Sequence, residues 1–222
     1  MSELPRRHST SQEHAVQWLR AAIVARELRP GARVVQDDVA AKIGVSVVPV
    51  REALRVLEQE GQLTYLPRRG YFVTELSIAD LEEIYALRGL LEARATCHAL
   101  PSLDDEAYAR MELAARDCVA AAQAGDIAAE LEANRRFHFA LMDAPDQPHA
   151  MRLIRTLWDS TESYRALYYN APPERENAAA AHERIMAAAR ARDAKQLIAE
   201  LDAHRERALT VLREILGDGE PA

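Results

Sequence analysis

Apolar residues recur every three to four positions along most of the chain, and this spacing predicts amphipathic helices. The first helix is expected over residues 10–28, where Ala15, Leu19 and Ala22 share one face. It ends at Pro30-Gly31, a pair that stops helices. The chain then changes its period several times before residue 77, whereas the rest keeps the helical period.

Two short helices separated by a glycine are expected next. The first covers residues 36–43, Gly44 provides the turn, and Ser46 is placed to cap the second helix. The apolar residues of the second helix fall at i, i+3, i+4 and i+7 and are therefore buried together: Val50, Ala53, Leu54 and Leu57. This order is that of a helix-turn-helix.

The opposite face of the second helix carries two arginines, Arg51 and Arg55, one helical turn apart. A guanidinium group can bond the O6 and N7 atoms of guanine or grip a phosphate. We therefore expect Arg51 and Arg55 to contact DNA, together with Ser46 and Val48 beside them. The alternative interpretation is an ordinary solvated face.

Two short strands are predicted over residues 62–66 and 71–74, with a tight turn between them. Arg68 and Arg69 lie in this turn. A hairpin beside a recognition helix can place such arginines on the DNA backbone or in the minor groove. Residues 1–76 are thus expected to form a winged helix-turn-helix domain.

Residues 77–222 are expected to form an all-α bundle of six helices, so the fold class is mainly α. Ser77 and Asp80 have the spacing of a capping box at its start, and Ser102 and Asp105 have the same spacing. Breaks between the helices are expected at five places: Leu100-Pro101, Gly125-Asp126, Ala144-Pro145, Pro172-Pro173 and Arg192-Asp193.

Charge differs between the two predicted domains. Residues 1–76 hold 11 Lys+Arg and 9 Asp+Glu, a net +2, and the remainder holds 17 and 26, a net −9. The total of −7 does not exclude DNA binding, because binding depends on charge gathered on one face.

With no apolar run long enough for a membrane and no signal-like start, we expect a cytoplasmic protein. Cys97 and Cys118 lack ligand spacing and are expected to be buried free thiols.

Four polar residues stand out in the predicted bundle. Asn134 and His138 share one helix face, and His182 and His204 lie on two later helices. Isolated histidines on helices are mostly surface or hydrogen-bonded core residues, and their spacing does not show that three helices converge. If they do converge, three imidazoles and an amide oxygen suit a zinc or nickel ion.

The N-terminal motifs resemble those of the GntR family of bacterial regulators. The family's Gly-Val-Ser turn, Pro-Val-Arg-Glu-Ala-Leu and Leu-x-x-Glu-Gly occur here at Gly44–Ser46, Pro49–Leu54 and Leu57–Gly61, and Pro30-Gly31 and Arg69-Gly70 also match. Val47-Val48 replaces a polar pair, typically Arg-Thr, that the family usually has. We expect a shifted operator preference with binding retained. Two interpretations of Val48 stay open: a contact with a thymine methyl group, or a silent change.

The later helices, with Asn134 to His138, look like the FCD ligand-binding domain of the FadR subfamily, and their number looks closer to its VanR-like branch. In metal-binding members, an Asp or Asn four residues before a histidine, plus two later histidines, binds a divalent ion. The resemblance therefore implies Asn134, His138, His182 and His204 as ligands of zinc or nickel. Because Asn replaces the commoner Asp, the ion should be held less tightly.

The resemblance further implies a homodimer that binds a pseudopalindromic operator as a repressor and is released by a small organic acid near the metal. Arg88 lies in a segment similar to the family's Arg-x-x-x-Glu helix and is the first candidate to pair with that acid; the alternative is a surface pair with Glu92. Arg135, Tyr164 and Arg165 are further candidates.

Two other functions stay open: a metal-free sensor of an apolar or acyl effector, and a metal-dependent helical hydrolase. Because no HExxH, phosphate loop or nucleophile motif is present, we expect no enzyme.

Overall fold

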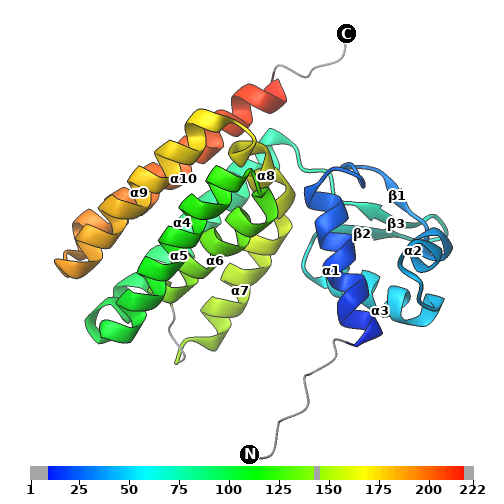
Figure 1. Cartoon of the computed structure of the whole chain (residues 1–222), viewed down its shortest axis with the longest axis horizontal. Coiled ribbons are helices and arrows are strands. Elements are labelled where there is room, and N and C mark those ends of the chain that lie inside the picture. The colour runs from blue at the N-terminus through cyan, green and yellow to red at the C-terminus, as the bar shows by residue number, and fades with distance from the viewer. Residues whose placement is uncertain (1–9, 143–145, 218–222) are drawn as a thin grey trace, which may run out of the picture. The chain divides into compact units, whose positions relative to one another are not determined.

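The computed structural model describes residues 10–142 and 146–217. The chain is mainly helical, as the hydrophobic spacing predicts, with a small sheet near the N-terminus (Figure 1). It divides into two compact units, of which the first ends at Glu75 and the second begins at Leu76.

The first unit is a winged helix-turn-helix, whose described residues form three helices and three short strands. Its sheet is antiparallel in the order β1-β3-β2, with Arg33 opposite Phe72 and Leu63 opposite Val73. Strand β1 was not predicted. The elements are α1 (Ser11–Val24), β1 (Arg33–Val34), α2 (Gln36–Ile43), α3 (Val47–Gln59), β2 (Leu63–Leu66) and β3 (Gly70–Val73).

The hydrophobic core of this unit fixes which face of α3 points outward. Leu54 and Leu57 are fully buried and belong to the same apolar cluster as Leu19 of α1 and Val73 of β3. The i, i+3, i+4, i+7 spacing is therefore confirmed as the buried stripe of α3. Gly44 ends α2 with a φ of 71°, a left-handed conformation that glycine adopts without strain.

The second unit is an all-α bundle. Figure 1 shows its last two helices, α9 and α10, running side by side. None of the described helices combines the length and the apolar character that a bilayer crossing requires. The helices are α4 (Ile78–Ala99), α5 (Asp105–Ala124), α6 (Ile127–Met142), α7 (Pro148–Ser160), α8 (Glu162–Tyr169), α9 (Pro172–Arg190) and α10 (Ala194–Gly217), with a short 3-10 turn at Leu100–Ser102.

The described part of this unit has seven α-helices, one more than the six expected, because the chain bends between α7 and α8 at Thr161. The Thr161 hydroxyl donates to the carbonyl oxygens of Leu157 and Trp158, and the Arg165 guanidinium donates to that of Trp158. These bonds satisfy carbonyls at the end of α7. The bend therefore keeps its backbone groups hydrogen-bonded.

Two details of the bundle correct the sequence expectations. The capping box of Ser77 and Asp80 is confirmed, but α5 is capped by Asp104, and the Ser102 hydroxyl instead donates to the Ala99 carbonyl. Cys118 is buried as expected, whereas Cys97 is exposed because it lies on an outward position of α4. Of the expected breaks, Ala144-Pro145 lies outside the described residues.

Candidate functional site

The exposed face of α3 carries the predicted DNA-contacting side chains. Arg51 Nε lies 3.4 Å from Gln36 Oε1, and an Arg55 guanidinium nitrogen lies 3.4 Å from Glu52 Oε1. Both arginines are exposed, and such long contacts hold them only weakly. Val48 is 65% exposed on the same helix, so its side chain is accessible to a DNA base edge.

Ser46 is the N-cap residue of α3, but its side chain makes no capping hydrogen bond. Its hydroxyl therefore is not committed to the helix end. In the β2–β3 turn, Arg68 adopts a left-handed φ of 65° and Arg69 lies over the Phe72 ring, 5.3 Å from its centroid. Both turn arginines are exposed, so their charge is available to an anionic partner.

In the second unit, α6, α9 and α10 bring three histidines together. One ligand atom from each of His138, His182 and His204 lies within 4.8 Å of the others, and Asn134 Oδ1 is 3.1 Å from His182 Nε2. Ligands about 2.1 Å from one ion are about 3.0 Å apart when adjacent and at most about 4.2 Å apart. Shifts of under about 1 Å would therefore complete a coordination sphere, and the donor set fits a divalent ion.

The protonation of these imidazoles also fits metal binding. Burial, followed by the nearby His204, holds the pKa of both His138 and His182 well below the ordinary value. Burial and then the positive charge of Arg88 lower the pKa of His204 to about 4. Neutral imidazoles keep a lone pair for an ion.

Hydrogen bonding within this cluster is incomplete. His182 Nδ1 is buried without a hydrogen-bond partner, and neither His138 nor His204 forms a hydrogen bond with another described residue. Buried polar atoms normally have partners, so these nitrogens favour a bound ion or water.

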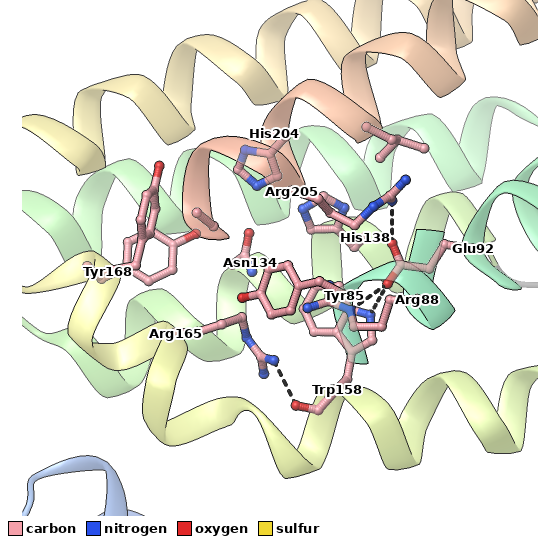
Figure 2. Close-up of a pocket in the computed structure, with 13 residues that line it drawn as sticks. Tyr85, Arg88, Glu92, Asn134, His138, Trp158, Arg165, Tyr168, His204 and Arg205 are labelled. Atoms are coloured by element: carbon pink, nitrogen blue, oxygen red, sulfur yellow. Dashed lines mark hydrogen bonds and ion pairs between the residues drawn. The ribbon is translucent and has the colours of Figure 1, made fainter. Parts of the chain in front are cut away.

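A small cavity is lined by Asn134, His138 and His204 (Figure 2), while His182 is not part of its lining. Its volume is about 30 Å³, room for one or two water-sized groups. Arg88, Arg165 and Arg205 also line it, together with Glu92, so three guanidinium groups and one carboxylate lie near the imidazoles. The cavity therefore suits a small anionic group.

Arg165 is buried and forms no ion pair among the described residues, although the negative charge of Glu162 partly offsets the lowering of its pKa. Its guanidinium donates to the Trp158 carbonyl at 2.7 Å and to the Thr161 hydroxyl at 2.8 Å, and its Nε is buried and unpaired. Burial and then the charge of Arg88 lower its pKa to about 10, so it remains positively charged at neutral pH. A desolvated cation with a spare donor is a natural partner for a carboxylate.

Arg88 is also buried, which contradicts the alternative of a surface pair with Glu92. Arg88 Nε donates to Glu92 Oε1 at 2.8 Å, and Arg205 donates to Glu92 Oε2 at 2.7 Å. The Trp158 indole nitrogen donates to Glu92 Oε1 at 2.7 Å. Burial opposes ionisation of Glu92, but Arg88 and Arg205 outweigh it and keep its pKa below the ordinary value.

Two of the predicted effector residues do not line this cavity. Arg135 forms an ion pair with Asp159 at 2.6 Å, and Tyr164 accepts a hydrogen bond from the Leu76 backbone at 2.7 Å. The sequence reasoning also missed Arg205 and Trp158, because nothing in their neighbourhood along the chain marks them. They are distant in sequence from Glu92 and meet it only through helix packing.

The Glu92→Gln variant is expected to unfold more easily. Glutamine keeps the shape but removes the charge that compensates Arg88 and Arg205, and breaking a buried pair in this way costs about 3–5 kcal/mol. Urea denaturation measures the free energy of unfolding. Glu106→Gln, at an exposed pair with Arg110, should cost no more than about 1 kcal/mol. Equal losses in both variants would show that the Glu92 cluster is not stabilising.

Two family models match the chain. "Bacterial regulatory proteins, gntR family" matches residues 11–73, and "FCD domain" matches residues 83–207. The HTH-type transcriptional regulator BphR of Paraburkholderia xenovorans (strain LB400) is 31% identical over 215 residues, which span 91% of this chain and 85% of BphR. YdhC of Bacillus subtilis (strain 168), also an HTH-type transcriptional regulator, is 28% identical over 192 residues, 86% of each chain.

Among solved structures, Escherichia coli McbR/YncC aligns with a TM-score of 0.81 at 24% identity, covering 94% of this chain and 100% of that one, which shows a shared fold. A winged helix-turn-helix followed by a helical effector-binding domain defines a DNA-binding transcription regulator rather than an enzyme. The chain belongs to the GntR family and carries an FCD domain, as its motifs predict.

Proposed function

We propose that this regulator is a repressor that releases its operator when a small carboxylate binds beside a divalent metal ion in the FCD domain. The observation that carries the proposal is a cluster of three neutral imidazoles, two of which line the same cavity as the buried Arg165, and Arg165 forms no ion pair among the described residues. A cluster of this kind is costly to bury unless ligands complete it.

Asn134, His138, His182 and His204 would hold the ion, and zinc or nickel suits three imidazole nitrogens best. When bound, the ion would supply a Lewis-acid position for a carboxylate oxygen. Because the Asn134 amide is neutral, the four ligands leave the ion's positive charge undiminished, which favours an anionic effector.

The effector carboxylate is assigned to Arg165 first and to Arg88 second. Arg165 has a free Nε donor and no carboxylate within ion-pair distance in the described ranges, whereas the charge of Arg88 is already compensated by Glu92. The small volume and charged lining favour a compact acid over the acyl chain of the alternative sensor.

On the DNA side, we assign Arg51 and Arg55 to base edges and Arg68 and Arg69 to the backbone, with Ser46 and Val48 completing the surface of α3. A homodimer would place two α3 helices in successive major grooves of a pseudopalindromic operator. As a regulator of bacterial operator DNA, it would act in the cytoplasm.

The Arg165→Gln variant tests the assignment of the effector. With zinc-loaded protein and acetate, malonate and citrate as probes, the wild type is expected to bind at least one of them. Arg165→Gln should bind that acid about ten- to a hundredfold more weakly, because a charge-assisted hydrogen bond contributes about 1.5–3 kcal/mol. Isothermal titration calorimetry gives the dissociation constants.

Arg135→Gln is the matched control, since it removes the same charge from a residue outside the cavity. It should leave carboxylate binding unchanged. Equal affinities in wild type and Arg165→Gln, or no binding of any probe to the wild type, would contradict a carboxylate effector held by Arg165.

A further inference from the structure

One face of α4 is apolar, exposed and uncovered by the described part of the chain. Leu90 is 72% exposed and Leu87 is 42% exposed, the former more than any other large apolar side chain described. The opposite side of α4 is buried, because the helix packs there on α6, α7 and α10. Adjacent exposed leucines on one helix face indicate a surface that a partner covers.

Charged residues flank the two leucines at symmetrical positions. Glu83, Leu87, Leu90 and Arg94 are separated by four, three and four residues, so they share one helix face. This spacing is the same in both directions along the helix. If α4 packs antiparallel against a second α4, Leu87 meets Leu90 and Glu83 meets Arg94, each contact occurring twice.

Glu83 and Arg94 are both exposed, and neither forms an ion pair within residues 10–142 and 146–217. By contrast, the neighbouring Glu82 of α4 forms an ion pair with Arg213 of α10. The two charges that flank the leucines are therefore left for a partner that offers the opposite sign at each end, as a second copy does.

The surface beside this face is hollowed. A groove of about 860 Å³ lies between α4 and α10, and its lining combines four small residues, Ala86, Gly89, Ala93 and Ala203, with Leu90, Leu209 and several charged side chains at its sides. Small residues allow another helix to approach closely, and the groove has room for leucine side chains from outside.

We propose that this α4 face is the surface through which two copies of the chain dimerise, with the two α4 helices antiparallel across a two-fold axis between Arg88 and Gly89. The inference rests on the proposed homodimer and adds which surface forms it. An isologous contact needs a self-complementary patch, and the Glu-Leu-Leu-Arg face meets that condition. Arg88 lies on the buried side of the same helix and lines the effector cavity, and the groove beside the proposed contact shares Tyr85 and Arg205 with that cavity.

A charge swap tests the proposal. In the full chain, Glu83→Arg and Arg94→Glu each place like charges opposite one another at two symmetric points. Each variant is expected to raise the dimer dissociation constant by about tenfold or more, and the double variant Glu83→Arg/Arg94→Glu should restore it to within about threefold of wild type. Sedimentation equilibrium at low salt measures these constants.

Glu132→Arg is the matched control, because it makes the same charge change at an exposed residue of α6 that forms no ion pair within the described ranges, and it should leave the constant unchanged. A monomeric wild type, unaffected single variants, or a double variant weaker than either single one would each overturn the proposal. Operator binding by the same variants distinguishes a failure of the α4 dimer surface from a failure of the proposed repressor function. If the wild type is a dimer that binds operator and Glu83→Arg does not change its dissociation constant, the proposed function is retained and the interface lies on another surface, for example at Leu113 and Val119 of α5.

Discussion

Replacing Arg51 or Arg55 with alanine is expected to weaken operator binding by about ten- to a hundredfold each, since a bidentate base contact contributes about 1–3 kcal/mol. Both side chains are exposed on the outward face of α3, and their contacts with Gln36 and Glu52 are long at 3.4 Å, so they can reorient toward DNA. Fluorescence anisotropy on a fragment selected from random DNA by the wild-type protein gives the affinities. If either arginine also contacts a phosphate, its alanine variant should show a plot of the logarithm of the binding constant against the logarithm of salt concentration that is shallower by about one unit of slope.

The fold should survive both substitutions, because neither side chain is buried. Arg110→Ala is the charge-matched control: Arg110 is exposed on α5 of the other unit, and among the described residues its ion-pair partner is Glu106. It should bind operator as the wild type does. Wild-type affinity in the Arg51→Ala/Arg55→Ala double variant would remove α3 as the DNA-contacting helix.

Replacing His138 with alanine is expected to weaken zinc binding by more than about a hundredfold. Removing a residue that directly ligates the ion should lower the affinity more than removing a residue that only hydrogen-bonds to a ligand. His138 contributes a buried nitrogen to the cluster with His182 and His204, and the described residues offer no other imidazole, thiol or carboxylate in its place. Competition with a chromophoric chelator measures the affinity. Circular dichroism checks that the helices persist.

His98→Ala is the control for this experiment. His98 is exposed on α4 and contacts Asp146, away from the cluster. This variant should bind zinc as the wild type does. If His138→Ala and His98→Ala bind zinc equally well, the histidine cluster is not the metal site.

The first unit could be predicted from the sequence almost entirely, because local patterns determine it. The buried stripe of α3, the Gly44 turn and the two strands around Arg68 follow from spacing and turn chemistry. Strand β1 could not be predicted. It has only two residues, Arg33 and Val34, which become a strand by pairing with β3 and have no periodicity of their own.

The candidate site in the second unit could be predicted only in part. Helical spacing places Asn134 and His138 on one face, but the approach of His182 and His204 depends on how α9 and α10 pack, which only the family resemblance implied. The i, i+4 spacing of Arg88 and Glu92 is visible in the sequence. Their burial is not, since Arg205, 113 residues beyond Glu92, completes that cluster.

Arg165 shows why the effector side chains were the hardest to predict. It was a minor candidate from sequence, yet its position at the cavity depends on the bend at Thr161, where a single continuous helix was expected. A threonine hydroxyl bonded to the preceding turn can bend a helix, but the sequence alone does not show which threonine will do so.

The most direct test of the account is the metal content of wild-type protein, purified without chelators, supplied with zinc or nickel and then dialysed. Inductively coupled plasma mass spectrometry should find about one divalent ion per chain, as four convergent ligands imply. Protein that is folded and binds operator but retains almost no ion would contradict the claim that Asn134 and the three histidines form the effector-linked metal centre of this repressor.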